Sequence, residues 1–183
     1  MSEDQANYLD TFPGWLRSLG DDAEGLSTLL EEDGLAEDAR EAVAGGLNYL
    51  FKSLDLIPDG IDDIGYLDDA FVLRVAADLA SRGESTGIDS GKLELLGRLT
   101  DECETVREFL GDNYERLEAY VVGLRKGAAR GRAVADILSE PAVLAELLSD
   151  VRGFSRSYES PSFAREEKNL IKLRAFFDAK LPK

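Results

Sequence analysis

Six aspartates fall within residues 53–69, in the segment SLDLIPDGIDDIGYLDD. Carboxylates are the preferred protein ligands of hard divalent cations such as Mg²⁺, Mn²⁺ and Ca²⁺, and they also serve as general acids and bases. No lysine or arginine lies between Lys52 and Arg74, so no neighbour in the sequence neutralises this charge. The candidate metal ligands are therefore Asp55, Asp59, Asp62, Asp63, Asp68 and Asp69.

The same segment contains seven large apolar residues, which a solvated acidic loop would not carry. We expect it to fold onto the helices that it joins, where two carboxylates ~4 Å apart repel by about 4 kcal/mol at an effective dielectric of 20. Backbone N–H groups, a distant arginine or a bound cation could offset this repulsion. In the capping alternative, Asp68 and Asp69 lie in the first turn of a helix, and Asp55 and Asp59 hold turns through their side chains.

The segment also carries strong turn signals. Ile57 precedes Pro58 and is biased toward extended backbone, which ends the preceding helix. Gly60 and Gly65 are expected to take positive φ and to mark turns. The aspartate spacing fits neither an EF-hand, since isoleucines occupy two ligand positions, nor a DDxxD motif. The pattern predicts a structured helix–loop–helix hairpin with an Asp/Pro/Gly-rich connection.

The composition removes several kinds of chemistry. The sequence contains no histidine, which excludes a Ser-His-Asp triad, a Cys-His pair and a histidine zinc site. Its single cysteine, Cys103, lies in an amphipathic helical pattern and is expected to be a buried structural thiol. One cysteine allows no intrachain disulfide, and the first residues do not resemble a signal peptide. A cytoplasmic location is therefore expected, and no segment is apolar enough to predict a membrane span.

The net charge of −16 is unevenly distributed. Residues 1–83 contain 19 acidic and 5 basic residues, a net charge of −14, whereas residues 84–183 contain 18 and 16, a net charge of −2. An acidic surface repels nucleic-acid backbones and attracts cations or a basic protein partner. We expect no nucleic-acid partner. A homo-oligomer is also compatible with the sequence.

The elements that would position the aspartates are all predicted to be helices, about seven to eight in an all-α bundle. Thr11 is the expected N-cap of the first helix, with Pro13 in its first turn. Leu54 continues the apolar face of the third helix, so we expect it to be buried. The predicted ranges are 12–19, 22–32, 35–53, 67–82, 92–110, 113–129, 131–138, 141–151 and 161–179. The ranges 92–110 and 113–129 alternatively form one long helix.

A linker over residues 81–91, SRGESTGIDSG, divides the chain into an acidic helical region, 1–83, and a C-terminal helical region, 84–183. The two regions form either separate cores or one compact domain. The basic C-terminal residues are expected to dock against the acidic first region.

The stretch YLFKSLDLIPDGIDDIGYLDDAFVL resembles the YkvA-like family, domain of unknown function number 1232. The family pattern is similar to Asp-x-Ile-Pro-Asp, a short turn, and Gly-x-x-Asp-Asp at the start of an apolar helix. The residues that match are Asp55, Ile57, Pro58, Asp59, Gly65, Asp68 and Asp69. The resemblance covers about residues 44–83, supports the hairpin and implies no activity. Asp62 and Asp63 depart from it, because relatives often have proline and a hydrophobic residue there.

Two functional hypotheses of different classes follow. The first is a non-enzymatic, cytoplasmic interaction or adaptor protein whose acidic first region faces a partner. The alternative is a divalent-cation-binding protein or a metal-dependent phosphohydrolase that uses residues 55–69, with Mg²⁺, Mn²⁺ or Ca²⁺ as the candidate ion. It requires at least three carboxylates to converge on one accessible point. A third hypothesis, mimicry of DNA by the acidic face, rests on net charge alone.

Overall fold

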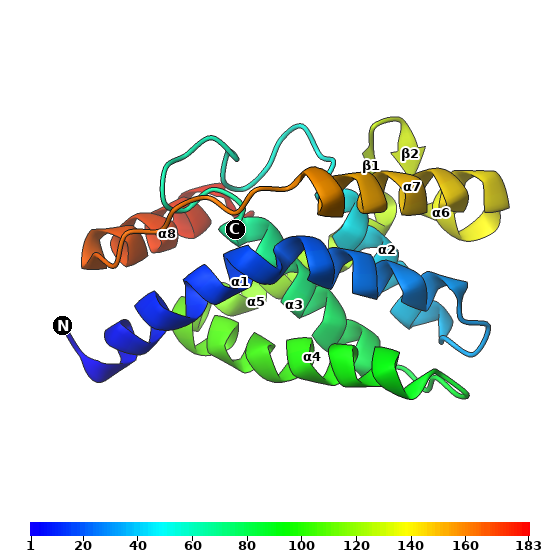
Figure 1. Ribbon diagram of the computed structural model, residues 1–183, viewed down its shortest axis with the longest axis horizontal. Helices are drawn as coiled ribbons and strands as arrows, with labels where there is room; N and C mark the ends of the chain where they lie inside the picture. The colour runs from blue at the N-terminus through cyan, green and yellow to red at the C-terminus, as the bar shows by residue number, and fades with distance from the viewer.

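A computed structural model describes residues 1–183 and confirms the all-α bundle (Figure 1). The α-helices are α1 (Glu3–Ser27), α2 (Glu37–Tyr49), α3 (Leu67–Ser81), α4 (Ser90–Leu110), α5 (Tyr114–Gly123), α6 (Val134–Ser139), α7 (Pro141–Ser157) and α8 (Glu167–Lys180). Three short 3-10 helices are η1 (Thr28–Glu31), η2 (Gly111–Asn113) and η3 (Leu124–Lys126). The only sheet is an antiparallel hairpin of β1 (Ala128–Ala129) and β2 (Arg132–Ala133).

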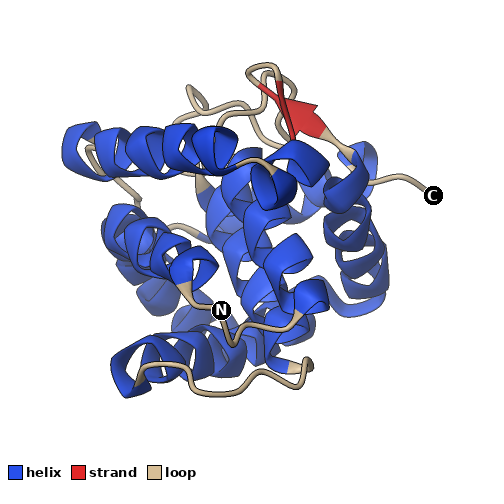
Figure 2. Cartoon of the chain, turned by 90° about the vertical axis from the view of Figure 1, so that its right-hand side faces the viewer, coloured by secondary structure: helices blue, strands red, loops and turns tan.

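The helix α3 lies at the centre of the bundle, and α1, α2, α4 and α5 pack around it (Figure 1). A second view shows that helices make up almost all of the bundle (Figure 2). Every residue from Leu67 to Ala77 is buried, as expected for a central helix that is apolar on all sides. The charged exceptions are Asp68, Asp69 and Arg74. A buried charge requires a partner, so the surroundings of these three residues decide what they do.

Arg74 has partners. Its guanidinium lies 2.7 Å from the Glu102 carboxylate and 3.5 Å from Asp22. It also stacks over the ring of Trp15, with 4.1 Å between Cζ and the ring centre. The arginine therefore joins α3 to α1 and α4 as a neutralised ion pair. No such cation accompanies the two aspartates at the start of α3.

One apolar core runs through the molecule, with members from Tyr8 to Leu181. Apolar residues from both sides of the predicted linker therefore pack in the same core. The basic C-terminal part lies against the first region, where Arg165 pairs with Asp10 at 2.8 Å. None of the helices has the combination of length and apolar character that a membrane crossing requires.

The N-terminal helices predicted over 12–19 and 22–32 are wrong, because α1 is one continuous helix. Its N-cap is Ser2, not Thr11, and Ser2 forms a capping box with Gln5. Pro13 lies inside the helix. Its missing N–H and its ring disturb the hydrogen-bond ladder. Burial of one long apolar face of α1 in the core outweighs that local cost.

Several further boundaries also differ from the predictions. The helix predicted over 113–129 ends at Gly123, and the helix predicted over 141–151 continues to Ser157. Because α2 ends at Tyr49, Leu54 lies in the following loop and is 81% exposed instead of buried. The helix predicted over 131–138 begins later, at Val134, because Arg132 and Ala133 belong to the hairpin. The turn of the hairpin contains Arg130 and Gly131, which both have positive φ. The last helix begins at Glu167, and residues 158–166, which we call the strap, contain no helix.

Candidate functional site

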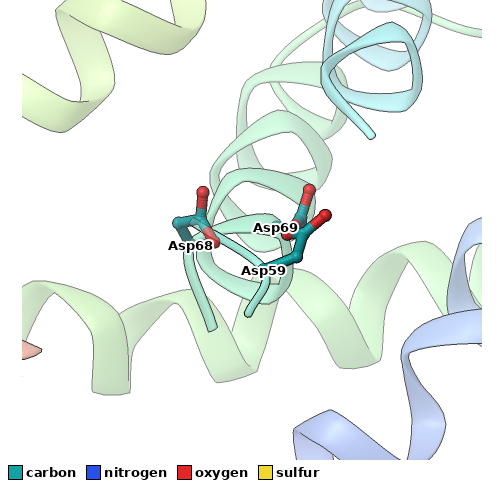
Figure 3. A group of neighbouring side chains, drawn as sticks. All are labelled: Asp59, Asp68 and Asp69. Carbon is teal, nitrogen blue, oxygen red and sulfur yellow. The ribbon is translucent and has the colours of Figure 1, made fainter. Parts of the chain in front are cut away.

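Three of the predicted aspartates meet at the start of α3. Asp59, Asp68 and Asp69 each place a carboxylate oxygen within 4.8 Å of the other two. Asp68 and Asp69 belong to the first turn of α3, and Asp59 reaches them from the preceding loop (Figure 3). The two helix residues are buried, at 0% and 2% exposure, whereas Asp59 is exposed. The group, here called the aspartate cluster, is thus closed on the protein side and open through Asp59.

The loop is held against the helix start by Gly65. A Cβ atom at this position would lie 2.2 Å from the carbonyl oxygen of Asp59, so only glycine allows the approach. The prediction that Gly60 and Gly65 adopt positive φ is wrong, because neither residue does. Asp63 and Tyr66 adopt that conformation instead, with φ of 69° and 67°. Gly65 therefore allows the close approach of the Asp59 backbone instead of forming a left-handed turn.

Asp68 is held by a small network of hydrogen bonds. The Tyr49 hydroxyl donates to Asp68 Oδ2 at 2.5 Å, and the Ile57 N–H donates to the same oxygen at 3.2 Å. The Leu56 N–H in turn donates to the Tyr49 oxygen at 2.7 Å. Ile57 is fully buried, so the loop is anchored by its apolar side chain as well. Tyr49 is not among the residues predicted for the site, and its position at the end of α2, next to the loop, is the only sequence signal for this role.

The remaining oxygens of the buried carboxyl groups have no donor. Asp68 Oδ1 and Asp69 Oδ2 are inaccessible to solvent and accept no hydrogen bond, and the same holds for Asp55 Oδ1 nearby. A buried acceptor without a partner is costly, and more so when it carries charge. The capping alternative accounts for one oxygen of Asp68 but leaves these three unexplained. Adjacent carboxylates in such a place require a proton or a cation between them.

The pKa values follow the same physics. Burial, with repulsion from Asp68 and Asp59, raises the pKa of Asp55 to about 7. Burial also raises the pKa of Asp68 to about 6, although the bonds from Tyr49 and Ile57 act in the opposite direction. The pKa of Asp69 is raised well above its usual value by burial and by the charge of Asp68. In the absence of a cation, the cluster therefore holds protons more tightly than isolated aspartates do.

Asp62 and Asp63 do not belong to the cluster. Asp63 Oδ1 accepts a hydrogen bond from the Ala164 N–H at 2.9 Å, which ties the loop to the strap. The backbone carbonyl of Asp62 accepts a bond from Lys172 at 3.4 Å, and the residue itself is exposed. These two positions are also the ones that depart from the family pattern. They attach the loop to the C-terminal region rather than extend the cluster.

A cavity of about 390 Å³ adjoins the cluster on its open side. Asp59 belongs to both, because it is one of the residues that line the cavity. The other lining side chains come from α7, from the hairpin turn and from the ends of the loop, and they include Phe51, Tyr66, Arg130, Asp150 and Phe154. Asp59 is therefore the residue through which the cavity adjoins the cluster.

Residues 39–74 match the sequence model of a family described as "Protein of unknown function (DUF1232)". The match confirms the resemblance to domain of unknown function 1232, although it covers 39–74 rather than about 44–83. It includes Tyr49 and the whole aspartate cluster. Comparison with curated proteins and with solved structures finds no match. The family description names no activity, so the chemistry has to be argued from the site.

Proposed function

We propose that this protein binds a divalent cation in the aspartate cluster, with Asp59, Asp68 and Asp69 as ligands and Asp55 as a nearby additional carboxylate. One observation carries the proposal. Asp68 and Asp69 are almost completely buried, and each has an oxygen without a hydrogen-bond donor. Each also places a carboxylate oxygen within 4.8 Å of one of Asp59. Asp22 and Glu102, by contrast, share the buried charge of Arg74. A hard cation would supply the missing partner to all three ligands at once.

The spacing of the oxygens is compatible with coordination. Two ligands on opposite sides of an ion are separated by twice the metal–oxygen distance, which is about 4.0–4.2 Å for Mg²⁺ and about 4.6–5.2 Å for Ca²⁺. The cluster oxygens lie within 4.8 Å of one another. This upper limit falls within the range for opposite ligands of Ca²⁺ and slightly above that for Mg²⁺, so the three carboxylates are close enough to share one ion. Water on the open side would complete the shell.

The interaction hypothesis has less support. It requires exposed apolar residues beside the acidic surface, and Leu54 is the only large apolar side chain exposed in the loop, at 81%. Single exposed apolar residues are normal on protein surfaces. A basic protein partner for the acidic first region stays a prediction of the charge distribution. We therefore place cation binding ahead of the adaptor role that the sequence favoured.

Thermal unfolding tests cation binding directly. The protein would be melted in EDTA, and then with Mg²⁺, Mn²⁺ or Ca²⁺ against NaCl of equal ionic strength. An ion present at 100 times its dissociation constant stabilises the folded state by about 2.7 kcal/mol. This corresponds to a rise of roughly 5–11 °C in the melting temperature for a chain of this size. We expect such a rise for at least one ion, and its loss in Asp59→Asn and Asp69→Asn.

Asp62→Asn is the matched control. It removes the same charge from the same loop, but at an exposed position outside the cluster. Its response to the ion should equal that of the unaltered protein. If all three variants respond equally, or if divalent ions act no more strongly than NaCl, the cluster is held by protons and cation binding is rejected.

A further inference from the structure

The cavity beside the cluster has a second charged wall. Arg130 lies in the turn between β1 and β2, and its side chain is 59% exposed. Its guanidinium stacks over the ring of Phe51, with 4.8 Å between Cζ and the ring centre. Both residues line the same cavity as Asp59. A ligand in this cavity would thus meet two positive groups, a cation bound to the cluster and the guanidinium of Arg130.

The acidic residue of this wall, Asp150, already has its negative charge balanced by an ion pair. Arg132 lies 2.5 Å from Asp150 Oδ2, whereas Arg130 lies at 3.4 Å from the same oxygen. The hydrogen bond from Arg132 keeps the pKa of Asp150 below its usual value, so the carboxylate stays ionised and paired. Arg132 is itself 3% exposed and fixed in place. The weaker contact leaves Arg130 available to a ligand.

The dimensions and the chemistry of the cavity favour a small molecule. Its volume of about 390 Å³ falls within the roughly 300–1,000 Å³ of ligand pockets. Phe51, Tyr66 and Phe154 provide aromatic surface, which is suited to a planar or apolar group. An organic cation is disfavoured as the ligand. Arg130 and Arg132 already lie over the Phe51 ring, and Arg132 already pairs with Asp150, so the groups that would bind such a cation are occupied.

We propose that this cavity binds a small phosphorylated compound together with the divalent cation, with phosphate oxygens contacting both the cation and Arg130. The inference rests on the proposed cation site. Mg²⁺ and Mn²⁺ commonly combine one or two carboxylates with substrate phosphates. Arginine presents a planar fork of donors that matches phosphate geometry. The aromatic wall would take the organic part of the ligand.

Equilibrium dialysis of the full chain with Mn²⁺ tests this proposal, with ADP, pyrophosphate and adenosine as probes. We expect retention of ADP in Mn²⁺ and its loss in EDTA. Arg130→Gln should weaken retention of ADP about tenfold or more, while the affinity for Mn²⁺ alone changes less than twofold. Arg125→Gln is the control, because Arg125 is similarly exposed, pairs with Glu41 and lines a different cavity. It should behave as the unaltered protein.

The outcomes separate the two proposals. Binding of Mn²⁺ without binding of ADP or pyrophosphate overturns the phosphate site and leaves the cation site standing. Equal retention of ADP by Arg130→Gln and by the unaltered protein overturns it as well, and so does retention of adenosine as strong as that of ADP. Failure to bind Mn²⁺, Mg²⁺ or Ca²⁺ overturns both proposals. Circular dichroism of each variant confirms that the helices are retained.

Discussion

The Tyr49 hydroxyl and Asp68 Oδ2 lie 2.5 Å apart and join the last residue of α2 to the first turn of α3. Between these two residues the chain leaves the helices for the loop that carries Asp55 and Asp59. The loop closes on the same pair, because Leu56 donates to Tyr49 and Ile57 donates to Asp68. The hydrogen bond therefore fixes the base of the hairpin on which the cluster is built.

Replacement of Tyr49 by phenylalanine should lower the free energy of unfolding by about 1–3 kcal/mol. The variant keeps the ring but leaves the Leu56 N–H without its acceptor and Asp68 without one of its two donors. Urea denaturation measures the change. Tyr120→Phe is the control, since the Tyr120 hydroxyl only accepts a bond from Lys52 at 3.2 Å in a partly exposed position. Equal losses in the two variants would contradict the role given to Tyr49.

The stability of the cation-free protein should fall as the pH rises from about 4 to about 7. An unfolded aspartate has a pKa of about 3.9. In the folded protein the pKa of Asp55 is raised to about 7 and that of Asp68 to about 6. The folded state therefore binds more protons within this window. Its stabilisation by these groups is complete below pH 4 and is lost as they ionise.

Urea unfolding in EDTA at pH 5 and pH 7.5 measures this dependence. Asp55→Asn removes one of the titrating groups, so the difference in stability between the two pH values should be smaller than in the unaltered protein. Asp62→Asn, which carries the same change of charge outside the cluster, should leave the difference unchanged. If Asp55→Asn and Asp62→Asn behave alike, the pKa of Asp55 is not raised.

Gly65→Ala should damage both the loop and the proposed cation site. The added methyl group would lie 2.2 Å from the carbonyl oxygen of Asp59, so the loop must move and Asp59 must move with it. We expect a loss of about 1–3 kcal/mol in unfolding free energy, the usual range for overpacking, together with a smaller thermal shift on adding the divalent ion.

Gly60→Ala is the matched control for that substitution. Its added Cβ atom would meet nothing within 4 Å, and its φ is not positive. The stability should change little, or rise by about 0.4–1 kcal/mol because the unfolded chain loses freedom. A loss as large as that of Gly65→Ala would show that loop flexibility, and not the contact with Asp59, is what matters.

Cys103 should be unreactive toward thiol reagents in the folded protein. It is 1% exposed, and burial raises the pKa of its thiol to about 11, so little thiolate exists at neutral pH. A disulfide exchange reagent at pH 8 should label the protein within seconds to minutes in urea, and far more slowly without it. Rapid labelling of the folded protein would contradict the burial that the structure assigns to this residue.

The parts of the fold that depend on local pattern were predictable from the sequence. The four-residue spacing of Leu67, Phe71 and Val75 located α3 to within a residue, because an interior helix has an unmistakable apolar character. Asp68 and Asp69 were correctly placed in its first turn. The convergence of Asp59 on them requires the close approach of its backbone to Gly65, a contact that no periodicity in the sequence predicts.

The errors arose where tertiary contacts outweigh local signals. A proline such as Pro13 normally indicates the first turn of a helix. Here α1 continues on both sides of Pro13, because its apolar face packs into the core on both sides. Leu54 continued a helical spacing, but the helix had already ended at Tyr49, whose hydroxyl is needed for the loop. The hairpin turn at Arg130 relies on a non-glycine residue at positive φ, which the sequence does not indicate.

The strap gives the aspartate loop a support that lies outside the family match. The Ala164 N–H donates a hydrogen bond to the Asp63 carboxylate. The Tyr158 ring lies 5.2 Å from the Tyr66 ring, and the Tyr158 hydroxyl donates a hydrogen bond to the Leu16 carbonyl. Residues 39–74 alone would carry every candidate ligand but would have to order the loop on binding, at about 1–2 kcal/mol per residue. If the proposed cation site is correct, its affinity for the ion depends on this preorganisation. The family motif would then supply the ligands, and the surrounding chain would set how tightly they bind.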